Sequence, residues 1–365
     1  MSKSDFSGKE IENETQIQLN NKLIQDIFND EKLIPNSYSG AKTYGTRDLL
    51  AKEFKKLGYK TDYIGNKYLM VHIGNERVIF YETESTKTSL LGYRILKNKN
   101  LARKFLKAAG ISIAVGKYFG RGEKKKAAAY ASSLSACVIK PSDGHKGNGV
   151  SVGVKNEQEF HNAWNTAIKN TQGGVLVEEQ FIGGIEARYL VVHGRCVAVL
   201  QRIPPSVVGN GNDTIETLIK KKNEERKKNP HLRNRLIKIN SHRLTILKGQ
   251  GFNLLSIPPN GVRVLIDWKA GFSTGADSYD ITDKVHPSFK KLAERAATNI
   301  PGLDTVGIDI IAHNHMKEPT SDNYIVVEAN TRPGILGHHF PVVGKPRNVA
   351  RNIAEYTVQK VLDSK

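Results

Sequence analysis

Apolar residues recur at helical spacing in some segments of this chain and at alternating spacing in others. Residues 1 to about 14 are polar and aperiodic, and we expect them to be disordered. Apolar positions over 19–27 then predict a first helix, and a second helix begins at Thr46 as N-cap and ends at Gly58. Gly65-Asn66 and Gly74-Asn75 separate three short β-like runs. These runs are 59–64, 68–73 and 77–81. This part predicts a small α/β unit.

The middle of the chain predicts a helix followed by a strand, a glycine loop, a second strand, a helix and a third strand. The first helix begins around Asn98 and ends at Gly110, and a Lys- and Ala-rich stretch, 121–131, predicts an exposed helix. The remaining expected elements are strands 137–140, 150–154 and 175–178 and the helix 157–170.

The last part of the chain is larger and again mixes both periods. We expect a hairpin over His193-Gly194, two buried strands late in the chain and a closing helix that includes Val349. The expected elements are strands 189–192, 196–201, 262–267, 306–312 and 324–329 and helices 215–227 and 289–300. The whole pattern predicts a mixed α/β (α+β) fold with three units, 1–95, 96–180 and 181–365.

Composition narrows the class of protein. The chain has 365 residues and 39% hydrophobic residues, which is ordinary for a globular protein. No apolar run is long enough for a membrane-spanning helix, and the polar N-terminus lacks a signal core, so we expect a cytoplasmic protein without membrane association. Its two cysteines, Cys137 and Cys196, fit buried thiols of a reducing compartment.

The charge balance favours an anionic partner. The formal net charge is +19, and the run 220–238 carries nine Lys or Arg against two Glu. A nucleotide, an acidic peptide, an anionic surface and nucleic acid all fit the sign. Aromatics are only 7% and do not interleave with basic residues, which argues against direct nucleic-acid binding. The basic run is either a solvated helix face or a platform for an acidic substrate.

A glycine-rich loop follows a buried strand in VIKPSDGHKGNGVSV, residues 138–152. Gly144, Gly147 and Gly149 let backbone N–H groups approach an anion, and Lys140 adds a point charge for a phosphate. The lysine precedes the glycines, so this is not a Walker A loop. The alternative is a tight hairpin with a surface lysine.

Acidic and amide groups gather on two late strands, VGIDII and IVVEANTRPG. Glu328 and Asn330 are two residues apart and so share one face, and Asp309 comes from the other strand. Two carboxylates and an amide form an oxygen set that suits Mg²⁺. The alternative is a carboxylate paired with one of the many lysines.

The segment VLVEEQFIGGIEARYLVV, residues 175–192, breaks from a strand at Glu178 into a loop with two glycines. Such a hinge can offer backbone groups to an adenine edge and Glu186 to ribose hydroxyls. A connector between domains is the alternative.

The order of these segments resembles that of ATP-grasp carboxylate–amine ligases over residues 88–362. Within that superfamily the chain is most similar to the ligase modules of cyanophycin synthetase and bifunctional glutathione synthetase. The segments that carry the closer match are 185–223, STGADSYDITDKVHP (273–287), GIDIIA (307–312) and VVEANTRPGILGHHFPVVGKPRNVA (326–350). The resemblance implies an ATP-grasp fold with a small N-terminal α/β domain, a central lid domain and a larger C-terminal domain, with ATP between the last two.

The resemblance also implies nucleotide-binding roles. Lys99 and Lys140 match the two phosphate lysines, and Asp143 to Gly149 match the flexible lid, with Gly144, Gly147 and Gly149 at its turns. Glu178, Glu179 and Phe181 match the adenine hinge, and Glu186 matches the ribose carboxylate.

The metal and catalytic roles follow from the same resemblance. Asp309, Glu328 and Asn330 match the ligands of two Mg²⁺, with Mn²⁺ as an alternative ion. Arg188 and Arg202 match arginines that hold the acyl phosphate or a substrate carboxylate. His338-His339 lie in a matched loop, where we favour packing and the alternative is contact with substrate. We interpret Asp280 and Asp283 as turn and cap residues, and the alternative is that they shape the acceptor side.

The implied activity is ATP-dependent formation of an amide or peptide bond through an acyl phosphate, with release of ADP and phosphate. The substrates would be amino acids, small molecules or peptides, and we expect an anionic one. A homodimer is a plausible assembly. Two alternatives stay open, an ATP-grasp member with a kinase-like or carboxylase-like outcome and a nucleotide-binding regulatory protein.

Overall fold

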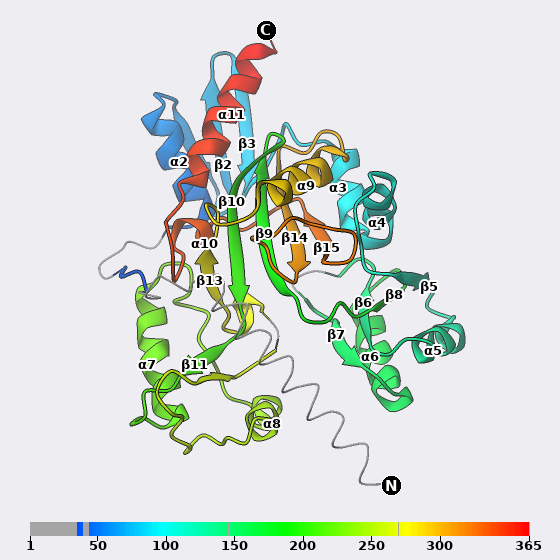
Figure 1. Cartoon of the computed structure of the whole chain (residues 1–365). Helices are drawn as coiled ribbons and strands as arrows, with labels where there is room; N and C mark the ends of the chain where they lie inside the picture. Colours follow the sequence, from blue (N-terminus) through cyan, green and yellow to red (C-terminus); the bar gives the residue numbers. More distant parts are fainter. Residues whose placement is uncertain (1–34, 39–43, 145–146, 269, 365) are drawn as a thin grey trace.

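The computed structural model describes residues 35–38, 44–144, 147–268 and 270–364, arranged around three β-sheets and a two-stranded ribbon (Figure 1). The segment expected to be disordered and the helix expected over 19–27 lie outside these residues. Each of the predicted ranges 1–95, 96–180 and 181–365 contains one of the three sheets, and the boundaries themselves stay predictions.

The N-terminal unit is one helix against a four-stranded antiparallel sheet. The helix α2 spans Thr46–Lys56, and its N-cap is Gly45, so Thr46 is the first helical residue rather than the cap. The strands, in the order β1-β2-β3-β4, are β1 Thr61–Ile64, β2 Tyr68–Ile73, β3 Glu76–Tyr81 and β4 Glu84–Ser85. The first three match the expected runs to within two residues, and β4 was not expected.

Two consecutive helices connect this unit to the middle of the chain. The helix α3, Leu90–Lys97, was not expected, whereas α4, Lys99–Ala108, begins where a helix was expected, with Asn98 as its N-cap. The apolar side chains of both helices pack into the core of the C-terminal sheet. Residues around Lys99 are therefore fixed against the large unit.

The middle unit is a four-stranded sheet covered by two helices, in the order β5-β8-β6-β7. Its elements are β5 Gly116–Phe119, α5 Lys124–Ser132, β6 Cys137–Pro141, β7 Ser151–Val154, α6 Glu157–Lys169 and β8 Val175–Glu179. All except β5 were expected. Phe160 and Trp164 of α6 and Ile139 of β6 lie in its separate core.

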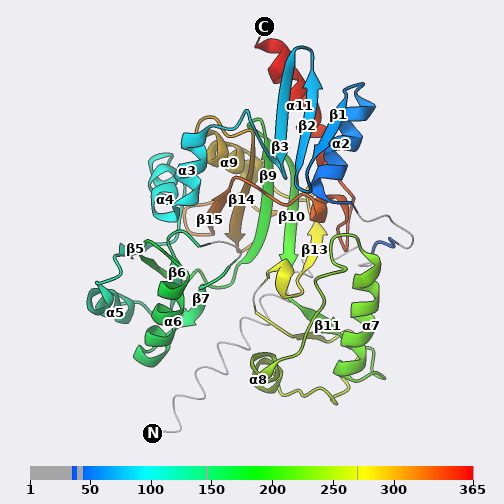
Figure 2. The same cartoon turned by 180° about the vertical axis from the view of Figure 1, so that it is seen from behind.

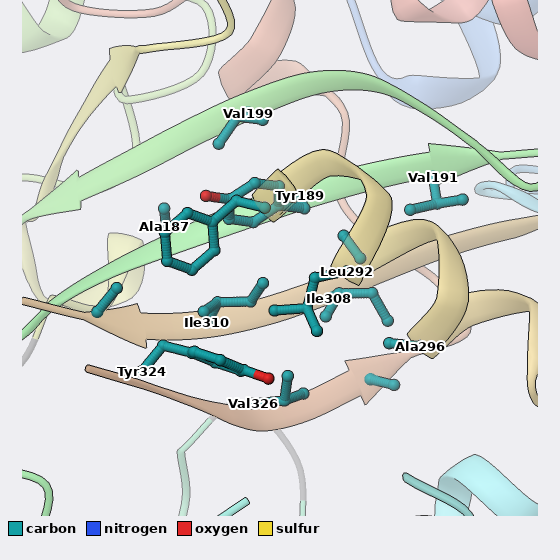
Figure 3. Close-up of a cluster of buried hydrophobic side chains, with 14 of the residues drawn as sticks. Ala187, Tyr189, Val191, Val199, Leu292, Ala296, Ile308, Ile310, Tyr324 and Val326 are labelled. Atoms are coloured by element: carbon teal, nitrogen blue, oxygen red, sulfur yellow. The ribbon is translucent and has the colours of Figure 1, made fainter. Parts of the chain in front are cut away.

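The central five-stranded sheet belongs to the C-terminal unit and has the order β13-β10-β9-β14-β15. Its strands are β9 Ile185–Val192, β10 Arg195–Ile203, β13 Asp277–Asp280, β14 Thr305–Ala312 and β15 Tyr324–Asn330. The helix α9, Pro287–Thr298, covers one face, where Tyr189, Ile308 and Leu292 meet in a continuous apolar core (Figure 3).

The opposite face of the sheet is apolar at one end of β9 and charged at the other end. Leu190 and Val192 lie in a core shared with α2, β2, β3 and the closing helix α11, Val349–Asp363. Glu186 and Arg188, earlier on the same strand and on the same side by alternation, are charged. The N-terminal unit therefore covers one end of this face, and charged side chains occupy the other end.

A β-bulge on β15 decides which of its side chains join the charged end. Asp309 pairs with Glu328, but the next residue, Ile310, pairs with Val326, so Val327 is the extra residue. Val326 lies in the core under α9, and the bulge allows Glu328 and Asn330 to face away from it.

A separate subdomain is inserted between β10 and β13. It contains β11 Ser206–Val208, α7 Ile215–Lys228, α8 Ser241–Gly249, β12 Arg263–Leu265 and the short 3₁₀ helix η1 Phe272–Thr274, and it has its own small core. Viewed from behind, this subdomain and the middle unit lie on opposite sides of the lower end of the central sheet (Figure 2). A last short helix, α10 Leu336–His339, lies near β10 and β13.

The interpretation of Asp280 as a turn or cap residue was wrong. Asp280 ends the buried strand β13, and its carboxylate accepts hydrogen bonds from Arg347 and Thr282. Within the described ranges, every helix is too short or too polar to cross a bilayer.

Candidate functional site

A network of two arginines and two carboxylates lies at the charged end of the central sheet. Arg188 and Asp309 are directly opposite each other on β9 and β14. Arg188 donates from Nε and Nη2 to both Asp309 oxygens, at 2.6 and 2.5 Å. Arg202 on β10 pairs with Glu186 and also approaches Asp309, at 3.5 Å. Gly307 contributes by its small size, because a Cβ there would lie 3.2 Å from Arg188 Cδ.

These charges stabilise one another away from water. Burial opposes the ionised form of Asp309, but Arg188 and Arg202 outweigh it and hold the pKa of the carboxyl below its ordinary value. Burial raises the pKa of Glu186, against the opposing effect of Arg202. Arg202 Nε is buried and has no acceptor among the described residues. The network therefore presents one unused N–H donor.

Lys99 connects this network to α4. Its ammonium pairs with Glu328, and its backbone N–H donates to the carbonyl of Ser142, at 2.8 Å. A lysine at a helix N-terminus opposes the helix dipole, and α4 has no acidic residue in its first turn. Such a position is unfavourable for stability but suitable for holding phosphate.

Lys140, the second predicted phosphate lysine, lies in a buried triad. Its Nζ is 2.7 Å from one oxygen of Glu178, and Arg103 of α4 pairs with the other. Arg103 also donates to the carbonyl of Ala114, at 2.7 Å. The Glu178 side chain thus holds Lys140 in place, a role that the sequence did not suggest. Arg103 was missed, because nothing in its local sequence distinguishes it from the other cations of its helix.

The glycine loop folds back over the end of β6. A Cβ at Gly144 or Gly149 would lie within 3.0 Å of Pro141 side-chain atoms, and Gly147 and Gly149 have positive φ angles. Asp143 anchors the start of the loop by accepting hydrogen bonds from the backbone N–H groups of Gln172 and Gly173. Residues 145–146, at the tip of the expected lid, lie outside the described residues.

The expected adenine hinge follows β8. Glu179 is exposed, and the Phe181 ring stacks on His313, with ring centroids 4.7 Å apart. His313 comes from the segment after β14 and was missed by the sequence analysis. Glu186, the expected ribose carboxylate, is paired with Arg202 instead of being free for a sugar, and its ribose role stays a prediction.

The chemistry of Asp309, Glu328 and Asn330 fits Mg²⁺. They supply two carboxylates and an amide from paired strands, and Asn330 Nδ2 donates to Asp309 Oδ2, at 3.2 Å. Among the described residues no group of three or more His, Cys, Asp or Glu is arranged to hold a metal, and the set here has two carboxylates, with an amide as its third member. Glu328 is paired with Lys99 and Asp309 with Arg188. A carboxylate has about four lone-pair sites, so Glu328, paired with Lys99, has room for a metal, whereas Asp309 accepts from Arg188, Arg202 and Asn330 and would exchange one of these contacts for the ion.

The basic run on α7 does not form a free cationic platform. Six of its cations are paired with carboxylates of the same helix or of neighbouring segments. These cations are Lys220, Lys221, Lys222, Arg226, Lys227 and Lys228. The solvated-face interpretation therefore describes this helix better than the substrate platform does.

His338 and His339 differ although they are neighbours on α10. His339 Nε2 accepts a hydrogen bond from the backbone N–H of Ala350, at 3.2 Å, as expected for a packing residue. His338 is 1% exposed, and neither of its ring nitrogens has a partner in the part of the chain that the structure describes. Packing alone does not explain His338.

Comparison with known proteins supports the predicted family resemblance. No protein-family model matches the chain. Cyanophycin synthetase from Geminocystis herdmanii is 34% identical over 275 residues, covering 75% of this chain and 31% of the relative. The bifunctional glutathione biosynthesis protein of Clostridium perfringens is 29% identical over 363 residues, covering 92% of this chain and 46% of the relative.

A solved structure gives the same result. The crystal structure of a bifunctional glutathione synthetase from Pasteurella multocida matches with a TM-score of 0.65 and 27% identity, over 86% of this chain and 44% of that chain. The chain thus spans less than half the length of these relatives. The resemblance to their ligase modules and the mixed α/β ATP-grasp fold class, both predicted from the sequence, are confirmed.

Proposed function

We propose that this chain, which has the ATP-grasp fold, is an ATP-dependent carboxylate–amine ligase that forms an amide or peptide bond and releases ADP and phosphate. One observation carries the proposal. Lys99 pairs with Glu328 at the end of the sheet where Arg188, Arg202 and Asp309 are held together, and its backbone N–H donates to the carbonyl of Ser142, two residues after Lys140. This is the charge arrangement that phosphoryl transfer to a carboxylate requires.

The nucleotide would lie between the middle unit and the central sheet. Lys99 and Lys140 would exchange their carboxylate partners for phosphate oxygens. The N-terminus of α4 adds favourable dipole charge at the same place. Phe181, stacked on His313, would contact the adenine, with Glu179 and the β8 backbone beside it.

Asp309, Glu328 and Asn330 would hold Mg²⁺, which neutralises phosphate charge when bound. We propose two ions, with Mn²⁺ as an alternative. Glu328 would be released from Lys99 as that lysine turns to phosphate. Asp309 would keep Arg188 in place through the reaction.

The reaction has two steps. A substrate carboxylate oxygen attacks the γ-phosphorus of ATP, the bond to the bridging oxygen breaks, and ADP leaves. An amine then attacks the acyl carbon, loses a proton, and expels phosphate. Arg202 Nε is an unused N–H donor in this network and would stabilise the oxyanion of the second step, while Arg188 would position the acyl phosphate. The loop from Asp143 to Gly149 would exclude water.

A coupled assay tests this function. Hydroxylamine is a small nucleophile that converts an acyl phosphate into a hydroxamate. The full chain is incubated with ATP, Mg²⁺, hydroxylamine and a panel of amino acids, dipeptides and other carboxylates. We expect ADP release that depends on a particular carboxylate, together with the matching hydroxamate by mass. ADP release that is indifferent to the carboxylate, or no hydroxamate with any member, would contradict the proposal.

A further inference from the structure

We propose that His231, Arg235 and His338 form a subsite for an anionic group of the substrate, a carboxylate other than the one that is activated. The inference rests on the proposed function and identifies the class of substrate, one with at least two carboxylates. It replaces the basic helix α7 as the place where a negative charge is bound.

The first observation is a pair of buried imidazoles with unused nitrogens. His338 is 1% exposed and His231 is 7% exposed. Among the described residues, neither ring nitrogen of His338 has a hydrogen-bond partner, and nor does Nε2 of His231. Leaving a buried polar group unpaired is destabilising. Two such groups close together indicate a missing partner rather than packing.

His231 and His338 are neighbours in the folded chain. A Cβ at Gly337, next to His338 in the chain, would lie 3.3 Å from His231 Nε2. Arg235 Nη1 lies 3.0 Å from His231 Nδ1, which must therefore accept. This contact fixes the tautomer, so Nε2 carries the hydrogen and is the unpaired donor.

The charge of the cluster favours an anion. Arg235 donates to the carbonyl and ring of His231 and forms no ion pair with a carboxylate of the described chain. Burial lowers the pKa of the Arg235 guanidinium below its ordinary value. Arg188 and Arg202 are among the charges that act on His338. A cation would be repelled here, whereas a guanidinium fork and an imidazole N–H suit a planar carboxylate.

The cluster borders the reaction site on the side away from the lysines. The Phe272 ring of η1 contacts the His231 ring edge-on, with centroids 4.7 Å apart, and Arg202 lies over the Phe272 ring, 5.4 Å from its centroid. The Arg202 side chain also pairs with Glu186 and approaches Asp309. A carboxylate held by Arg235 would therefore be close to a second carboxylate held at Arg202.

Calorimetric titration of the full chain without nucleotide tests the subsite directly. The probes are linear diacids from malonate to adipate, each compared with its half-amide, which keeps one carboxylate and the chain length. We expect the best diacid to bind about ten-fold more tightly than its half-amide, since a hydrogen bond to a charged group is worth about 1.5–3 kcal/mol. The difference should largely vanish in Arg235→Gln and remain in the control Lys227→Gln, which removes an exposed charge of the same subdomain.

A second variant separates a binding role from a structural one. His338→Leu removes an unpaired buried group, so we expect an unchanged or higher Tm together with loss of the diacid preference. A lower Tm with the preference retained would show that His338 only packs. Equal affinity for diacid and half-amide, or no binding of either, would overturn the subsite. The hydroxamate assay is independent, so failure of the subsite and failure of the ligase activity are distinguishable.

Discussion

The two faces of the central sheet use the same strands for opposite purposes. Under α9, Tyr189, Ile308 and Phe289 form an apolar core. His315, which packs against Phe289, has a partner at each ring nitrogen, since Nδ1 lies 2.8 Å from the Tyr189 hydroxyl and Nε2 lies 2.8 Å from the Ile185 carbonyl oxygen. On the other face, Arg188 and Asp309 are buried as charges, and His338 is buried without a partner.

Because side chains alternate along each strand, residues that stabilise the fold lie on one face of the sheet and residues proposed for chemistry lie on the other. The α9 face satisfies its polar groups internally, so it needs no ligand. The opposite face holds charges whose present partners can be exchanged for phosphate, metal or substrate carboxylate. Changes on the first face should therefore alter stability with little effect on binding, and changes on the second face should do the reverse.

Glu328→Gln should give the largest effect. It removes a proposed metal ligand, and loss of metal stabilisation worth about 4 kcal/mol corresponds to roughly a thousand-fold slower Mg²⁺-dependent ADP formation. The free energy of unfolding should change by less than about 1 kcal/mol, because the Lys99–Glu328 pair is partly exposed. Steady-state ADP release and urea unfolding measure the two effects. Near-normal turnover would remove Glu328 from the metal site.

Phe289→Ala should produce the opposite pattern. Phe289 is fully buried and contacts Tyr189 and His315, so its truncation should cost about 3–5 kcal/mol of stability. The KM for ATP of the folded fraction should stay the same, because no proposed ligand lies on that face. Urea unfolding monitors the first effect and ADP release at low temperature the second. A changed KM with normal stability would contradict the separation.

The pH dependence of stability should reveal His315. Burial lowers its pKa to about 4, against an ordinary value of 6.5. Between these values the unfolded chain binds a proton that the folded chain does not, so stability falls as the pH drops from 6.5 to 4, by at most about 3 kcal/mol. Burial lowers the pKa of His338 and His339 in the same direction.

The contribution of His315 to stability is therefore measured by comparing the unchanged chain with His315→Gln. His315→Gln should be less stable than the unchanged chain at pH 7, and its stability should decline less between pH 6.5 and 4. If the free energy of unfolding falls equally in the two proteins between pH 6.5 and 4, His315 has the same protonation in the folded and unfolded chain, which would contradict this prediction.

The smallest expected effect concerns Lys99, for which phosphate and Glu328 would compete. Without Mg²⁺, Glu328→Gln frees Lys99 for phosphate, so ADP should bind more tightly in EDTA, by about 1.4- to 5-fold, since a partly exposed pair is worth about 0.2–1 kcal/mol. Lys99→Gln should weaken binding under the same conditions. Calorimetry measures both, and unchanged ADP affinity in Glu328→Gln would show that the pair does not compete with phosphate.

Much of this fold follows from local sequence. Strand β2 begins and ends where the alternation predicts, and α4 begins at Asn98, whose side chain accepts from Leu101 N–H. Strand β13 was missed because Asp277 and Asp280 look like turn residues, yet they are buried against cations from distant segments. Local patterns carry no information on such partners.

The candidate site shows the same limit. Sequence identified Arg188 and Asp309 and placed Glu328 and Asn330 on one face. It did not predict that Arg188 opposes Asp309, because strand register depends on long-range pairing, nor that a bulge turns Glu328 away from the core. The histidine cluster joins residues from the inserted subdomain and α10 that are about a hundred positions apart.

The central claim is that the charged face activates a carboxylate as an acyl phosphate. The most direct measurement follows the oxygen atoms. A carboxylate that supports ADP release is labelled with heavy oxygen, and the released phosphate is analysed by mass spectrometry. The account predicts one heavy oxygen in each phosphate released with product, because the attacking carboxylate oxygen leaves with phosphorus. Unlabelled phosphate, with all label retained in the product, would contradict it.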